Sequence, residues 1–261
     1  MIMGLAPIVA PLIGSLLQAG FGWRACFVFI FLAGIVAAAA VRWLLPETLR
    51  PRPPAPASGM WASILVVARH RGVRAHLAIV AAGYAGLFAF ISGSPFVLQI
   101  THGLTPFGFG LSFAAASLGY VIGTWLAATF VTRLGLDRTI GWGARAMALG
   151  GLAMVLATAL APEAVGGIVA PMMVYLFGMG LAMPQALAGA LQPFPERAGA
   201  ASSLIGCVQQ SVAAATGALV GQSLGTTAWP LVWGIAIPGV ITLVVWAMTR
   251  AARRPGGSRR G

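Results

Sequence analysis

The amino-acid sequence predicts an all-α membrane protein with about eight transmembrane helices. Hydrophobic residues make up 59% of the 261-residue chain and charged residues only 8%, whereas a soluble domain is about 25% charged. The apolar residues gather into long runs, and each run is close to the ~20 residues that a helix needs to cross a bilayer. The basic residues stand in the gaps between runs. Apolar surface on this scale has to be solvated by lipid, so the lipid bilayer is the first partner predicted.

The eight runs and the gaps between them predict the domain organisation. The runs cover roughly residues 1–19, 23–45, 75–99, 107–131, 140–160, 168–192, 200–225 and 229–249. The longest gap, 46–74, starts with a proline-rich stretch that disfavours regular structure and ends with several arginines. We therefore predict two helices in 1–45, a cytoplasmic linker over 46–74, a six-helix bundle over 75–249 and a basic cytoplasmic tail over 250–261.

The arginines predict the orientation of the helices. The net charge of +12 could suggest nucleic acid, but the basic residues are all arginines and lie between membrane-length runs, which is the positive-inside pattern. If the 46–74 linker is cytoplasmic, every one of the 16 arginines except Arg24 is also on the cytoplasmic side. The sequence thus predicts a multi-pass protein of a bacterial inner membrane with a cytoplasmic C-terminus and no nucleic-acid partner.

The residues that carry enzyme chemistry do not form a recognisable set. Cys26 and Cys207 lie inside apolar runs, and the three histidines fall near helix ends, where we expect solvated or interfacial side chains. No phosphate-binding loop and no pairing of nucleophile and base is visible. We predict neither a catalytic site, nor a metal site, nor a cofactor.

Polarity differs from run to run with a period of three. The runs 23–45, 140–160 and 229–249 are almost pure hydrocarbon, whereas the runs between them carry polar groups that should face the bundle interior or a wet cavity. Such a period is typical of transporters built from three-helix repeats. The first visible triplet holds only two helices, so the chain is expected to begin within a repeat.

Candidate binding residues lie on these mixed-polarity runs. Tyr84, Phe88 and Ser92 follow one another at i, i+4 and i+8, and Tyr175 lies on a methionine-rich run close to Gln185. Core packing explains each of these residues about as well as contact with a ligand. The adjacent amides of Gln209 and Gln210 need partners, so at least one of them should face the interior or the cavity.

Small residues at helical spacing mark candidate helix contacts. In the first run they lie along one face, which suits either ordinary packing or a specialised interface between two bundles. Glycines four residues apart in two later runs favour close helix crossing and imply no substrate role. The candidate interface residues are Gly4, Pro7, Pro11, Gly14, Gly119, Gly123, Gly217 and Gly221.

Five segments together resemble the Bcr/CflA drug-resistance branch of the major facilitator superfamily. GLAPIVAPLIGS at 4–15 is similar to the antiporter motif of the family's fifth helix, although Ser15 replaces a glycine of its usual pair. LPETL at 45–49 resembles the end of the sixth helix and ISGSPFVLQ at 91–99 the seventh. RLGLDR at 133–138 resembles a repeat of the cytoplasmic gating loop, and FPERAGAASS at 194–203 the entry to the eleventh helix.

The resemblance implies a proton-driven exporter of small amphipathic compounds that works by alternating access. The visible helices would be helices five to twelve of the family fold, with the mixed-polarity runs around the cavity and the hydrocarbon runs against lipid. Asp137 and Arg138 would lie in a gating loop between two helices. The family's first four helices would be missing, and since no carboxylate is visible at mid-membrane depth, the proton site is expected on them.

Two alternatives remain open at this stage. An importer of a metabolite could share the fold, although importers of anions or sugars usually need fixed charges or several hydrogen-bonding groups in the cavity. A membrane fragment without transport activity is the other alternative.

Overall fold

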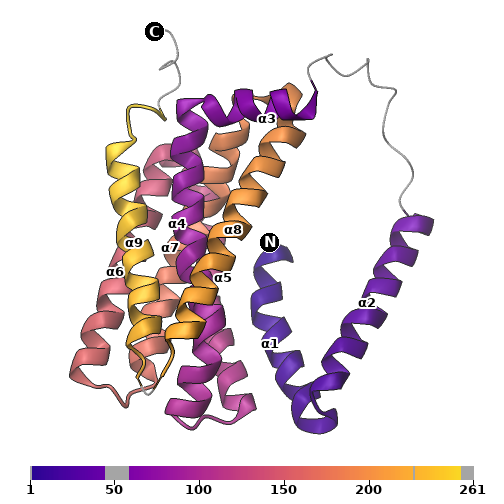
Figure 1. Ribbon diagram of the computed structural model, residues 1–261, viewed down its shortest axis with the longest axis vertical. Helices are drawn as coiled ribbons and strands as arrows, with labels where there is room; N and C mark the ends of the chain where they lie inside the picture. The colour runs from indigo at the N-terminus through magenta and orange to yellow at the C-terminus, as the bar shows by residue number, and fades with distance from the viewer. Residues whose placement is uncertain (1, 45–58, 226, 254–261) are drawn as a thin grey trace.

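The computed structural model describes residues 2–44, 59–225 and 227–253 and shows long helices lying side by side (Figure 1). In chain order, the described helices are α1 (Ile2–Phe21), α2 (Trp23–Leu44), α3 (Met60–Arg69), α4 (Arg71–Pro95), the π-helical turn η1 (Phe96–Thr101), α5 (Pro106–Leu134), α6 (Leu136–Leu160), α7 (Gly166–Leu191), the 3-10 turn η2 (Pro195–Arg197), α8 (Ala198–Ser223) and α9 (Trp229–Met248).

Every membrane-length run of the sequence forms a long helix. Seven of the described helices, α2 and α4 to α9, are long and apolar enough to cross a membrane, and α1 forms a 20-residue helix over the first run. The prediction of an all-α membrane fold is confirmed. In Figure 1, α4 to α9 form one bundle, and α1 and α2 form a hairpin beside it in which α1 packs against α5.

The predicted linker contains a helix that sequence reasoning missed. α3 occupies Met60–Arg69, and α4 begins at Arg71 instead of near residue 75. The apolar stretch of α3 is only 10 residues long, too short to cross a bilayer. The prolines before it and the arginines after it favoured the prediction of an irregular linker. The proline-rich stretch itself lies outside the described residues.

The predicted loop between the fourth and fifth runs does not exist as a loop. Only Gly135 separates α5 from α6, with a φ of 80° that favours glycine. Asp137 and Arg138 therefore lie in the first turn of α6, which corrects the prediction that they occupy a gating loop. A carboxylate at this position interacts favourably with the positive end of the helix dipole.

α7 is the most buried of the spanning helices, and glycines bring it close to its neighbours. A Cβ at Gly119 of α5 would lie 2.0 Å from the carbonyl oxygen of Met173 in α7, and a Cβ at Gly123 would lie 2.2 Å from that of Phe177. Gly143 of α6 lies equally close to the backbone of α7 at Gly178. Gly119 and Gly123 therefore lie at a close crossing of α5 and α7, inside the six-helix bundle.

The faces that α6 and α9 turn away from the bundle are apolar. Side chains exposed by about half or more recur along both helices at the spacing of one helical face: Trp142, Leu149, Leu152, Leu156 and Leu160 on α6, and Trp233, Ile237, Ile241, Val244 and Met248 on α9. The exposed residues of α8 are different in kind, since they include Ser203, Cys207, Gln210, Ser211 and Ala214. The outer faces of α6 and α9 are typical of lipid contact.

The α5–α7 crossing yields a test. Gly123→Ala should lower the free energy of unfolding by about 1–3 kcal/mol, because the new methyl group meets a backbone carbonyl that cannot move away. The matched control is Gly206→Ala on α8, where a Cβ meets nothing within 4 Å and alanine favours the helix. Unfolding of both variants is followed by circular dichroism in detergent. Equal stability of the two variants would contradict the close crossing.

Candidate functional site

Three polar side chains from three different helices interact with one another electrostatically. The side chain of Tyr84 in α4 interacts electrostatically with that of Gln209 in α8 and with that of Tyr120 in α5. All three residues are partly exposed. We call Tyr84, Tyr120 and Gln209 the tyrosine–glutamine cluster. It joins helices that the sequence assigned to the cavity, and Tyr120 is a member that the list of candidate binding residues left out.

The face of α4 around this cluster is partly exposed. Phe88 lies one turn from Tyr84 and is partly exposed, and Ser92 lies one turn further and is exposed. The group offers two phenolic hydroxyls, a primary amide and aromatic faces, and it contains no fixed charge. Such a surface can hold an apolar ring and hydrogen-bond one or two polar groups, and aromatic faces also attract cations.

Tyr175 does not belong to this surface. Its side chain is fully buried, its hydroxyl donates a hydrogen bond of 3.1 Å to the carbonyl oxygen of Gly83, and its ring lies against Gly86 and Gly239. The missing Cβ atoms of the two glycines make room for the ring. Core packing therefore accounts for the position of Tyr175, which is one of the residues predicted to bind a ligand.

The remaining candidate amides are placed differently from one another. Gln185 is half-buried on α7, whereas Gln210 is exposed on the outer face of α8, next to its partly buried neighbour Gln209. Of the adjacent pair, it is Gln209 that reaches the cluster. A prediction from sequence could not separate the two, because neighbours on a helix point about 100° apart and the facing direction was unknown.

A second polar group lies where α6 begins and α9 ends. Arg253 donates a hydrogen bond of 2.8 Å from Nε to Oδ1 of Asp137, and its other nitrogens donate to the hydroxyl of Thr249 and the carbonyl oxygen of Trp246. The Arg253 side chain is 1% exposed and that of Asp137 is 35% exposed. This is the one ion pair found among the described residues.

Trp246 completes this group, which we call the Asp137–Arg253 clasp. Its indole Nε1 donates to the carbonyl oxygen of Asp137 at 3.1 Å, and the guanidinium of Arg145 lies 4.7 Å from its ring centre. The sequence predicted a basic cytoplasmic tail from residue 250, and Arg253 of that segment is held against the bundle by these contacts. The sequence shows few acids and an arginine-rich tail, but it does not specify which arginine pairs with Asp137.

His76 is also placed differently from expectation. The sequence suggested a solvated or interfacial imidazole, but His76 is only 4% exposed. Its Nδ1 lies 2.8 Å from the carbonyl oxygen of Gly72, and its Nε2 has no hydrogen-bond partner among the described residues. Because the carbonyl can only accept, Nδ1 carries a proton, and Nε2 is packed against Gly189.

The predicted interface glycines fall into two groups. A Cβ at Gly217 of α8 would lie 2.6 Å from the hydroxyl of Ser92 in α4, so this glycine makes a close crossing. Gly14 and Gly221 have nothing within 4 Å of such a Cβ, and close packing by these two is not seen among the described residues. Gly4, Pro7 and Pro11 lie in the continuous helix α1, but the placement of their side chains lies outside what the structure describes.

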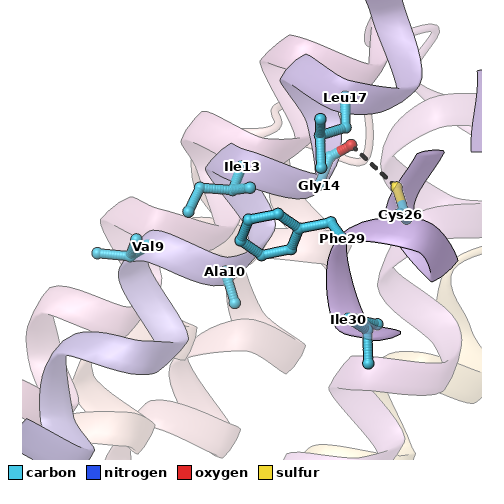
Figure 2. Close-up of a pocket in the computed structure, with 8 residues that line it drawn as sticks. All are labelled: Val9, Ala10, Ile13, Gly14, Leu17, Cys26, Phe29 and Ile30. Atoms are coloured by element: carbon cyan, nitrogen blue, oxygen red, sulfur yellow. Dashed lines mark hydrogen bonds between the residues drawn. The ribbon is translucent and has the colours of Figure 1, made fainter. Parts of the chain in front are cut away.

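An apolar groove runs between α1 and α2 (Figure 2). Its volume is about 340 Å³, and it is lined by Val9, Ala10, Ile13, Gly14, Leu17, Cys26, Phe29 and Ile30. The only polar contact drawn there joins the Cys26 thiol to the carbonyl oxygen of Gly14 at 3.6 Å (Figure 2). The groove offers no group that could orient a polar ligand. Across the described residues, no three His, Cys, Asp or Glu side chains gather in a way that could hold a metal ion.

Comparison with known proteins gives a coherent set of relatives. The chain is 29% identical to a bicyclomycin resistance protein homolog of Haemophilus influenzae over 93% of its length, and 28% identical to a chloramphenicol resistance protein of Pseudomonas aeruginosa over 88%. It is 31% identical to multidrug resistance protein D of Escherichia coli over 78% of its length. The matches cover 61%, 54% and 51% of these relatives, so the chain spans between half and two-thirds of their length.

A family model settles the assignment. The model of the Major Facilitator Superfamily matches residues 1–218, which include α1, α2 and most of the six-helix bundle. The match points to a transporter and away from an enzyme. It agrees with the all-α spanning fold and with the resemblance of the five sequence segments to a drug-resistance branch. The chain is a multi-pass membrane protein that belongs to the major facilitator superfamily.

Proposed function

We propose that this chain supplies the cargo-binding surface of a drug-efflux transporter for small amphipathic compounds. The observation that carries the proposal is the tyrosine–glutamine cluster, where partly exposed hydroxyl and amide groups of α4, α5 and α8 interact, with the partly exposed Phe88 one turn away on α4. The printed names of the relatives, which concern resistance to bicyclomycin, chloramphenicol and multiple drugs, support the same class of cargo.

The chemistry of the cluster favours amphipathic cargo over a charged metabolite. An importer of anions would need a fixed positive charge near its ligand, and the cluster contains none. Arg145 and Arg253 are held at the end of the bundle by Trp246 and Asp137. Neutral donors and acceptors set among aromatic rings can accept many ligands, because no single charge pairing is required.

We further propose that export proceeds by alternating access, with the arginine-rich end of the bundle in the cytoplasm of a bacterium. The exposed arginines of α3, α4 and α5 share one end of the bundle with the clasp, as expected of a cytoplasmic face (Figure 1). The bacterial relatives point to the inner membrane. The exposed small and polar residues of α8 suit a surface that slides against protein better than one that faces lipid.

Coupling to protons would require a titratable group that is accessible from each side of the membrane in turn. The described carboxylates are not placed for this role, since Asp137 is paired with Arg253, and Glu163 and Glu196 are exposed between helices. Glu47 lies outside the described residues. We therefore propose that the proton carrier lies on helices other than those described, as the family resemblance also implies.

The cluster can be tested by ligand binding. Tyr84→Phe and Gln209→Leu should each weaken the binding of amphipathic fluorescent drugs to the purified chain about fivefold, because each removes a polar group that would form one hydrogen bond to the drug, worth about 1 kcal/mol. The measurement is a fluorescence titration in detergent.

Two matched variants sharpen this test. Tyr175→Phe removes a hydroxyl that is buried away from the cluster, so it should lower the melting temperature without changing drug affinity. Gln192→Leu replaces an exposed amide at the end of α7 and should change neither quantity. If all four variants bind the drugs equally well, the cluster is not the binding surface.

The clasp can be tested by a double-mutant cycle. Asp137→Asn and Arg253→Gln should show a coupling of about 1–2 kcal/mol in thermal unfolding, since the pair is charge-assisted but one partner is a third exposed. If the clasp is also part of the gate, Asp137→Asn in an active transporter changes turnover more than stability. Glu163→Gln, an exposed carboxylate outside the spanning helices, serves as control. Additive effects in the cycle would contradict the pair.

The placement of the carboxylates predicts a negative transport result. The 261-residue chain, reconstituted alone in vesicles, should bind drugs but show no export when a pH gradient is applied. Drug accumulation is followed by fluorescence, with a longer relative from the family as the positive control. Robust gradient-driven export would overturn the assignment of the proton carrier, and loss of that export in His76→Gln would identify the buried imidazole as the carrier instead.

A further inference from the structure

α3 lies across the arginine-rich end of the bundle instead of running along it (Figure 1). A single residue, His70, ends α3 and begins α4, with φ and ψ of −72° and 122° that turn the chain sharply. Its imidazole Nδ1 accepts a hydrogen bond of 3.3 Å from the backbone N–H of Val73, and its ring meets Phe194 edge-on at 5.4 Å between ring centres. The corner is therefore built by specific contacts.

One face of α3 is held against the bundle. Val67 is fully buried and packs with Val73 of α4 and Ala201 of α8, and Leu204 of α8 and Phe194 cover the same small core. These contacts fix which side of the helix faces away. Since α3 has 10 residues and one buried stripe, the opposite stripe stays open in the described structure.

The open face of α3 is apolar, although it lies at the arginine-rich end of the bundle, where polar surface residues would be expected. Trp61 is 79% exposed, Leu65 is 51% exposed and Val66 is 46% exposed. Leu65 lies opposite Val67, and Trp61 and Val66 lie on the two flanks of that face. Met60, 68% exposed, begins the helix. Exposing this much apolar surface to water is unfavourable by roughly 25 cal/mol for each Å².

Exposed arginines follow this apolar face directly. Arg69 ends α3, and Arg71 and Arg74 lie in the first turn of α4. None of the three forms an ion pair within the described part of the chain. The neighbouring turn η2 carries Glu196 and Arg197, whose charges cancel, so the surface beside α3 stays positive.

We propose that α3 is an interfacial helix that binds anionic phospholipid. Trp61, Leu65 and Val66 enter the boundary between headgroups and acyl chains, and Arg69, Arg71 and Arg74 bind lipid phosphates. Apolar residues with tryptophan on one side and arginines beside them are what a helix in the membrane plane requires. The positive charge distinguishes this partner from a second protein surface, because it complements the negative potential of anionic lipid.

The position of the apolar face is tested with a fluorescent label. In a Cys26→Ser, Cys207→Ser background, Leu65→Cys is labelled with bimane and the full chain is reconstituted in vesicles of phosphatidylglycerol and phosphatidylcholine. Nitroxide on the upper acyl chain should quench the label strongly, and aqueous iodide should quench it weakly. A label at Glu163→Cys, in an exposed turn, is the control and should respond mainly to iodide.

The role of the arginines is tested by lipid binding. Native mass spectrometry of the purified chain measures the affinity for phosphatidylglycerol, which should fall roughly fivefold for each of the three arginines changed to glutamine. Arg24→Gln, an exposed arginine remote from α3, should leave this affinity unchanged.

Each test can overturn the proposal. Strong iodide quenching at residue 65 would place α3 in water, and insensitivity to both quenchers would mean that protein covers it. Unchanged lipid affinity after all three arginine substitutions would exclude the headgroup contact. Circular dichroism and a normal melting temperature confirm that the variants are folded, and neither test depends on drug binding or transport.

Discussion

The contact on which the rest of the structure depends is the approach of α7 to α5 and α6 at backbone distance. Lipid gives helices no hydrophobic drive to associate, so packing between backbones has to hold them together. Gly119, Gly123 and Gly143 remove the side chains that would keep these helices apart. α7 also packs against α4, because the hydroxyl of Tyr175 in α7 donates a hydrogen bond to the carbonyl oxygen of Gly83 in α4. The tyrosine–glutamine cluster inherits its geometry from this arrangement, because Tyr84 and Tyr120 lie on helices that α7 positions.

The sequence predicted the spanning helices well, because each one is marked by a run of about 20 apolar residues, and the thickness of the bilayer sets the length of that run. It missed α3, whose apolar stretch is too short to give that signal. It also placed Asp137 in a loop, because a single glycine can join two long helices and a charged residue after it looks like a connection. Local composition cannot distinguish these cases, since both depend on how the chain turns at one residue.

Individual site residues were harder to predict than helices. Tyr84 and Tyr175 have the same chemistry and lie on similar runs, but one reaches the cluster and the other fills the core. What separates them is the identity of the residues opposite, Gln209 for the first and Gly86 and Gly239 for the second. Those partners are far away in the sequence. The same holds for Arg253, whose burial follows from Asp137 and Trp246.

The Asp137–Arg253 clasp has a consequence for how the protein is made. The two residues are separated by 116 positions, and membrane helices are inserted in order as the ribosome delivers them. α6 must therefore enter the bilayer while its first-turn carboxylate has no arginine to pair with. The pair can close only after α9 has been inserted and the chain beyond it has folded back. Closure of the clasp thus marks the completion of bundle assembly, and a nascent chain stalled before residue 253 would display an unpaired acid at the start of α6.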